Sequence, residues 1–182
     1  QVSKENDSEE NKLNNTSNEK TNNVINALKE DEYIVTNVQK KERNRASKPP
    51  FITSTLQQDA SAKYNYNAKR VMRIAQKLYE GVEVGKERVG LITYMRTDST
   101  RLAPLFVSQV KKYIEEKYGH EYVGKGNTKG STKANVQDAH EAIRPTSINR
   151  EPNKIKQYLS NDEFKLYSMI YKRSLASLMA DA

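Results

Sequence analysis

The chain has 182 residues, 35% hydrophobic and 30% charged, and its 31 Lys and Arg against 23 Asp and Glu give a formal net charge of +8. The absence of cysteine excludes disulfide scaffolds and cysteine-based zinc sites, and no apolar run approaches the roughly 20 residues of a membrane helix. A basic chain with no apolar leader is predicted to be a soluble intracellular protein with a polyanionic partner, nucleic acid being the first candidate.

Most of the polar excess lies in residues 1–23, which contain seven Asn, three Lys and five acidic residues. Only Val2 and Leu13 are aliphatic there, so burial of apolar surface cannot offset the entropy of ordering the segment. We therefore predict a disordered linker or insertion over 1–23. The polar start without Met indicates a piece of a longer protein, and residues 24–182 carry a net charge of +10.

Two short elements are predicted before the first proline pair. A helix over 24–29 is followed by a β-branched strand over 33–38 and then by a basic run. Pro49-Pro50 cannot continue a helix and marks a boundary. We assign 24–48 to a different structural unit from 49–182.

After the prolines the apolar residues recur mostly at helical spacing. The pattern predicts helices over 54–63, with a capping box starting at Ser54, and then over 68–80, about 103–118, 139–143, 152–159 and from a capping box at Ser160 onward. A short buried strand is predicted over 89–94, and a basic Gly/Ser/Thr loop over 124–134. The predicted fold class is mainly α, a helical domain with one short strand leading to Tyr94.

The densest polar cluster, TYMRTDSTR over 93–101, follows that strand. Tyr94 and Arg96 would project the same way from extended backbone, which places a phenol beside a guanidinium. A phenolic oxygen can serve as nucleophile and as leaving group in phosphoryl transfer, and arginine presents paired donors to a phosphate. A buried tyrosine beside a solvated arginine is the commoner arrangement, so the residues alone leave both interpretations open.

A second cluster is QDAHEAIRPT over 137–146. In a helix, His140 and Arg144 lie one turn apart and share a face, which suits a phosphate site. The H-E-x-x-H zinc signature is absent, because Arg144 stands where the second histidine belongs. A histidine that caps a helix through a backbone hydrogen bond fits the same residues.

Three strings, PPFITSTLQQDAS (49–61), GLITYMRTDSTR (90–101) and QDAHEAIRPT (137–146), closely resemble bacterial DNA topoisomerase I of the type IA family, in the family's order. The resemblance implies an isomerase that relaxes negatively supercoiled DNA by cleaving a single strand, passing a strand and religating without ATP. Tyr94 would be the nucleophile and would hold the 5′ phosphate as phosphotyrosine.

The resemblance also implies roles for other residues. Arg96 would clamp the scissile phosphate and stabilise its developing charge, and His140 would contact the phosphate or the active-site network. Four more residues match family positions along the active site or the DNA path: Gln76, Asp98, Ser99 and Arg144.

The family's Mg²⁺ is bound by a D-x-D-x-E cluster in a Toprim domain, and no D-x-D occurs in this chain. The resemblance thus implies no metal or cofactor here, and it implies the Toprim and arch domains of the same polypeptide as partners. Residues 24–48 would be a partial β-arch segment. The isolated chain is expected to be inactive, and the parent enzyme to lie in the bacterial cytoplasm with the nucleoid, away from membranes.

Two other functions remain open at this stage. A non-catalytic helix-turn-helix-like module that binds DNA fits the basic charge equally well. A tyrosine recombinase fits less well, because it needs several Arg and His residues around a tyrosine late in its domain, whereas Tyr94 is central.

Overall fold

The computed structural model describes residues 18–29, 35, 37–41, 43–126 and 140–182. The chain divides into two units, Gln1–Glu42 and Arg43–Ala182, and each is described by itself. None of the helices in the described part of the chain has the length and apolarity that a membrane crossing requires.

The described part of the first unit is mainly one helix, α1 (Asn18–Lys29). It begins six residues before the predicted 24–29, because a helix forms its backbone hydrogen bonds internally and polar residues can extend it without burial. Of the strand predicted over 33–38, the described residues Val35, Asn37 and Val38 pair with no strand and are exposed. Residues 1–17 lie outside the described residues, and the division into linker and arch segment stays a prediction.

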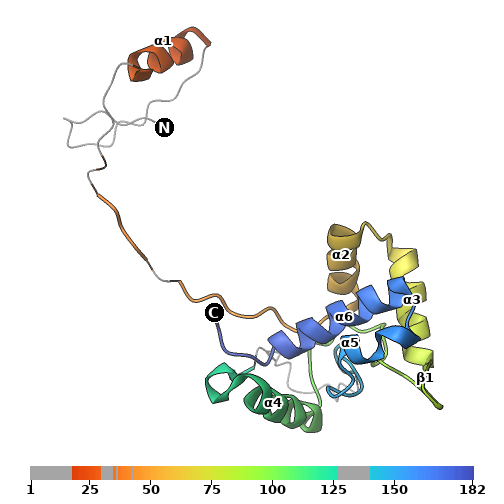
Figure 1. Cartoon of the computed structure of the whole chain (residues 1–182). Coiled ribbons are helices and arrows are strands. Elements are labelled where there is room, and N and C mark those ends of the chain that lie inside the picture. Colours follow the sequence, from red (N-terminus) through yellow and green to blue (C-terminus); the bar gives the residue numbers. More distant parts are fainter. Residues whose placement is uncertain (1–17, 30–34, 36, 42, 127–139) are drawn as a thin grey trace. The chain divides into compact units, whose positions relative to one another are not determined.

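The second unit is mainly helical, as predicted, with α2 (Thr53–Tyr64), α3 (Ala68–Glu80) and α6 (Asn161–Ala176) packed together in Figure 1. The buried residues of α3 follow the spacing i, i+3, i+4 and i+7: Val71, Ile74, Ala75 and Leu78. The predicted bounds of α3 are confirmed. The predicted capping box of α6 is confirmed too, since Glu163 N–H donates to the Ser160 hydroxyl and Ser160 N–H donates to the Glu163 carboxylate.

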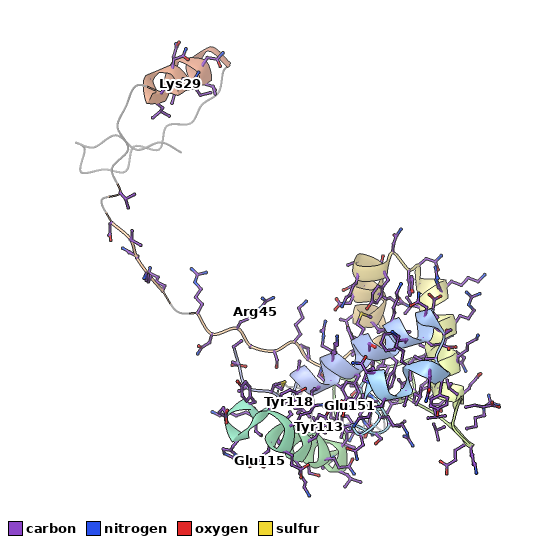
Figure 2. All side chains as sticks on the ribbon, viewed as in Figure 1. Lys29, Arg45, Tyr113, Glu115, Tyr118 and Glu151 are labelled. Carbon is purple, nitrogen blue, oxygen red and sulfur yellow. The ribbon has the colours of Figure 1, made fainter. Side chains whose placement is uncertain are left out.

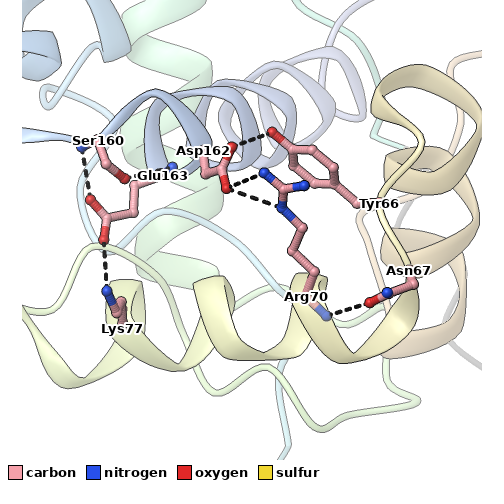
Figure 3. Close-up of polar contacts among 7 residues, drawn as sticks. All are labelled: Tyr66, Asn67, Arg70, Lys77, Ser160, Asp162 and Glu163. Atoms are coloured by element: carbon pink, nitrogen blue, oxygen red, sulfur yellow. Dashed lines mark hydrogen bonds and ion pairs between the residues drawn. The ribbon is translucent and has the colours of Figure 1, made fainter.

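A polar cluster ties the start of α3 to the start of α6 (Figure 3). The Tyr66 hydroxyl donates to Asp162 at 2.7 Å, and Arg70 bonds the other oxygen of the same carboxylate at 2.7 and 3.1 Å. These hydrogen bonds, the one from Tyr66 first, hold the pKa of Asp162 below its ordinary value. Arg70 also stacks on the Tyr66 ring, so α3 is fixed against α6 at this end.

The remaining helices of this unit lie between the β-strands and α6 in sequence. They are α4 (Pro104–Tyr118), the single turn η1 (His120–Tyr122), and α5 (Pro152–Ile155) continued by η2 (Lys156–Tyr158), close to the predicted 103–118 and 152–159. Tyr113, Glu115 and Tyr118 mark α4 in Figure 2. Of the predicted loop over 124–134, residues 124–126 carry no regular structure and the rest lies outside the described residues.

Backbone hydrogen bonds join the two ends of this unit. Arg45 N–H donates to Ala182 O at 2.7 Å, and Ala182 N–H donates back to Arg45 O at 3.2 Å. The segment before the proline pair, where Figure 2 labels Arg45, is therefore paired with the last described residue.

The sheet differs from the prediction. β1 (Val82–Val84) and β2 (Glu87–Val89) form an antiparallel hairpin in which Val82 pairs with Val89. Its turn contains Gly85 at φ 70°, a left-handed conformation that glycine adopts without strain. The strand predicted over 89–94 is wrong, because β2 ends at Val89 and the residues after it form no strand, with Ile92 making an isolated bridge to Pro145.

Two predicted helix features are also wrong. α2 begins at Thr53 with Ile52 as its N-cap, so Ser54 lies inside the helix and not at its cap. The described part of the segment predicted as a helix over 139–143 is extended, because Ile143 pairs with Phe51. Residue 139 lies outside the described residues.

Candidate active site

The three sequence strings meet in the structure and are bonded to one another through the backbone. Thr53 N–H donates to Thr97 O at 2.9 Å, and Ile143 N–H donates to Phe51 O at 2.8 Å. The second and third strings are joined by Ala142 N–H, which donates to Arg101 O at 2.8 Å. Segments that are about 40 to 90 residues apart in sequence therefore form one local unit.

Two threonine hydroxyls hold the backbone on either side of Tyr94. The Thr93 hydroxyl donates to Ala142 O at 2.7 Å and accepts from Arg144 N–H at 3.0 Å. The Thr53 hydroxyl lies 2.8 Å from Met95 O and accepts from Thr97 N–H at 2.9 Å. Sequence reasoning did not single out either residue, and the only signal available was their presence inside the matched strings.

Tyr94 itself projects from this anchored turn. Its side chain is 44% exposed, while Met95 next to it is 1% exposed and belongs to the core. Arg96 is exposed again, so the alternation predicted for an extended segment holds from Tyr94 to Arg96. The Tyr94 ring meets the ring of Tyr79 edge-on, with centroids 5.3 Å apart.

The approach of α3 to this turn depends on a glycine. Leu91 N–H donates to Leu78 O at 2.7 Å, and a Cβ at Gly90 would lie 2.7 Å from Tyr79 O. Only a residue without a side chain permits this contact. The end of α3 therefore sets where Tyr79 stands against Tyr94.

An open hollow of about 450 Å³ lies beside the turn. It brings together three of the predicted site residues, Arg96, Asp98 and His140, with the first turn of α2. Sequence reasoning gave no part in the chemistry to the α2 residues that line it, Thr53, Ser54 and Gln57. The positive end of the α2 dipole and the Arg96 guanidinium both favour an anion there.

Tyr94 is not among the described residues that line this hollow. The nucleophile candidate therefore stands on the adjoining surface, one buried residue before Arg96. His140 is exposed at the hollow, and its backbone carbonyl accepts from the Arg101 guanidinium at 3.4 Å. The predicted helical face shared by His140 and Arg144 is wrong, because the segment is extended.

The Arg144 side chain contacts other residues of the fold. Its side chain is 14% exposed and bonds Glu141 through two nitrogens, at 2.8 and 2.6 Å. Another nitrogen donates to Pro145 O at 3.0 Å, and the guanidinium lies over the Phe106 ring at 4.3 Å. These contacts give Arg144 a bracing role beside the site.

Ser99 and Gln76 are also held by neighbours. Ser99 is 8% exposed, its N–H donates to the Thr97 hydroxyl and its own hydroxyl accepts from Arg101 N–H, which orders the turn after Arg96. Gln76 lies on α3 and donates to Glu80 at 2.5 Å. Neither side chain lines the hollow among the described residues.

Metal ligands do not converge in the described part of the chain. No group of three or more His, Asp or Glu side chains there could hold a metal ion. The chain's own residues at the site thus offer an arginine, a histidine, a helix N-terminus and an exposed phenol.

Two comparisons with known proteins show what this chain is similar to. A family model described as DNA topoisomerase matches residues 1–182. The chain is also similar to the solved structure of full-length topoisomerase I from Thermotoga maritima, with 43% identity and a TM-score of 0.67. That match covers 76% of this chain and 22% of the Thermotoga chain.

Proposed function

The chain belongs to the type IA family of DNA topoisomerases, and from that premise we propose that it carries the nucleophile of a bacterial topoisomerase I. DNA is the substrate that family membership implies. The proposal assigns the chain a single-strand cleavage through Tyr94, followed by strand passage and religation without ATP. Relaxation of negatively supercoiled DNA is the result.

The proposed chemistry is an exchange of one phosphoester for another. The Tyr94 oxygen gives up its proton and attacks the phosphorus of a phosphodiester in single-stranded DNA. The bond from phosphorus to the 3′ oxygen breaks, and that oxygen takes up a proton. The 5′ phosphate stays on Tyr94, and attack by the 3′ hydroxyl reverses each step.

One observation carries this proposal: an exposed tyrosine on a doubly anchored turn adjoins a hollow that holds Arg96 and His140. The clamps at Thr53 and Thr93 keep the backbone of the turn in place, so the phenol can be presented with little loss of entropy. Arg96 would bind the scissile phosphate and offset its developing negative charge. His140 would contact the same phosphate across the hollow.

The remaining parts of the proposed enzyme lie outside this chain, which spans 22% of the Thermotoga protein. We propose that Mg²⁺ is held by a Toprim domain of the same polypeptide, since the described residues offer no fitting ligand set. The steps assigned to Tyr94, Arg96 and His140 use only the atoms of this chain. The bacterial cytoplasm, where the nucleoid provides the DNA, is the proposed location.

A relaxation assay tests the proposal. The chain alone, incubated with negatively supercoiled plasmid and Mg²⁺, should leave the plasmid supercoiled while binding single-stranded oligonucleotides more tightly than duplex. A ladder of relaxed topoisomers from the chain alone would contradict the proposed division of the site. A preference for duplex would contradict the proposed substrate and would favour a duplex-binding module.

A further inference from the structure

A second hollow, of about 490 Å³, lies between α2 and α6. Its apolar part includes Phe51 and Met169, and its charged part consists of Asp59, Lys63, Lys172 and Arg173. Nothing in the proposed reaction uses these residues. We call this place the α2–α6 hollow.

The two hollows lie on opposite sides of α2. At 100° per residue, Ser54 and Gln57 share one face of the helix, whereas Asp59 and Lys63 share the face across from it. Phe51 and Ile52, just before α2, line different hollows in the same way. A ligand in the α2–α6 hollow is therefore separated from Arg96 and His140 by the body of α2.

The charge of the α2–α6 hollow is positive and largely uncompensated. Arg173 is paired with Asp59 and lies over the Phe51 ring at 4.2 Å, so these two charges cancel. Lys63 and Lys172 form no ion pair with any described residue. A third lysine, Lys165, stands close by, because its ammonium and that of Lys63 lie 5.6 and 5.5 Å from the same Tyr64 ring.

The combination suits a nucleotide better than a bare anion. Three ammonium groups can each neutralise a phosphate, and the exposed Ala62 and half-buried Ala176 in the lining give a small apolar surface for a sugar. The Tyr64 ring, near both Lys63 and Lys165, adds an aromatic side chain of the kind that contacts bases.

We propose that the α2–α6 hollow binds the phosphodiester backbone of single-stranded DNA, at a site separate from the one beside Tyr94. This inference rests on the proposed function for the identity of the polymer. The site adds affinity on the far side of α2 and takes no part in bond cleavage.

The first test is the salt dependence of binding, measured by fluorescence anisotropy with a labelled oligo-dT and the whole chain. Changing Lys63, Lys165 and Lys172 together to Gln should lower the slope of log K against log salt by about 2, at roughly 0.7 per lost contact on a single strand. The affinity should fall by up to about 100-fold at 0.1 M salt, by the same relation. The matched control changes Lys86, Lys111 and Lys125 to Gln, which removes the same charge elsewhere.

The second test uses the four methionines as local probes. Methyl NMR spectra of Met169 report on the α2–α6 hollow, and those of Met95 report on the turn between Tyr94 and Arg96. With oligo-dT, both methyl signals should shift in the unmodified chain. In the triple lysine variant, the Met169 shift should disappear while the Met95 shift remains.

The outcomes separate the two proposals. A Met95 shift without a Met169 shift, or a salt slope lowered equally by the control, would overturn the second site and leave the proposed function standing. A Met169 shift without a Met95 shift would support the second site and count against the proposed function. No binding of oligo-dT by the unmodified chain would overturn both.

Discussion

Replacing Thr53 by valine tests the anchoring of the turn that carries Tyr94. The substitution keeps the branched shape and removes one hydroxyl, which accepts from Thr97 N–H and donates to Met95 O or, at 3.0 Å, to Thr97 O. One hydroxyl proton serves one carbonyl at a time, so the loss amounts to two hydrogen bonds. At about 0.5–1.5 kcal/mol each, the free energy of unfolding should fall by roughly 2 kcal/mol.

Chemical and thermal denaturation, both followed by far-UV circular dichroism, measure this loss. For a unit of this size, 2 kcal/mol corresponds to a fall in Tm of about 4–8 °C. Thr100→Val is the matched control, because the Thr100 hydroxyl makes no hydrogen bond to any described residue. Equal effects of the two substitutions would refute the anchoring role of Thr53.

Three other predictions concern stability around the site. Gly90→Ala should lower the free energy of unfolding by about 1–3 kcal/mol, because the new Cβ would clash with the Tyr79 carbonyl oxygen. Urea unfolding measures this loss, and an unchanged unfolding midpoint would contradict the close contact. Hydrogen bonds lower the pKa of Glu151 to about 2, the largest effect coming from Lys117 and a smaller one from a second lysine. The Glu151 carboxylate therefore stabilises the fold fully above pH 4.5, and this stabilisation is lost as the pH falls toward 2. The Tm advantage over Glu151→Gln should therefore shrink across that interval, and a constant difference would count against the ion pair. Tyr171→Phe should lower the free energy of unfolding by about 1 kcal/mol, because the hydrogen bond from the Tyr171 hydroxyl to the Ile148 carbonyl is lost. Burial raises the pKa of Tyr171, so alkaline titration at 295 nm should show one fewer tyrosine with a raised pKa in this variant.

The elements that sequence could predict are those specified by local signals. The spacing of apolar residues fixed α3, and the capping box at Ser160 fixed the start of α6. The hairpin of β1 and β2 is not predicted from the sequence, although its valines flank a turn that contains glycine. The strand is assigned instead to the apolar run that follows, over 89–94. A run of apolar residues does not distinguish a strand from a buried extended segment.

The errors arose where contacts distant in sequence decide the structure. Residues 140–143 have a helical composition, but pairing of Ile143 with Phe51 holds them extended. The Arg144 side chain next to this pairing is only 14% exposed and bonds Glu141, whereas the family resemblance implies a place along the active site or the DNA path. The clamps at Thr53 and Thr93 span 42 to 51 residues, and no local pattern marks them.

The role of Tyr94 is the central claim, and a covalent adduct tests it most directly. Residues 43–182 would replace the matched segment of Thermotoga maritima topoisomerase I, and the chimera would be incubated with a 3′-labelled single-stranded oligonucleotide and Mg²⁺, then denatured. The label should migrate with the protein as a 5′-phosphotyrosyl adduct, and peptide mapping should place it on Tyr94. Tyr94→Phe should abolish the adduct, whereas Tyr79→Phe, the neighbouring tyrosine, should retain it. An adduct that survives Tyr94→Phe, or that maps to another residue, would contradict the account.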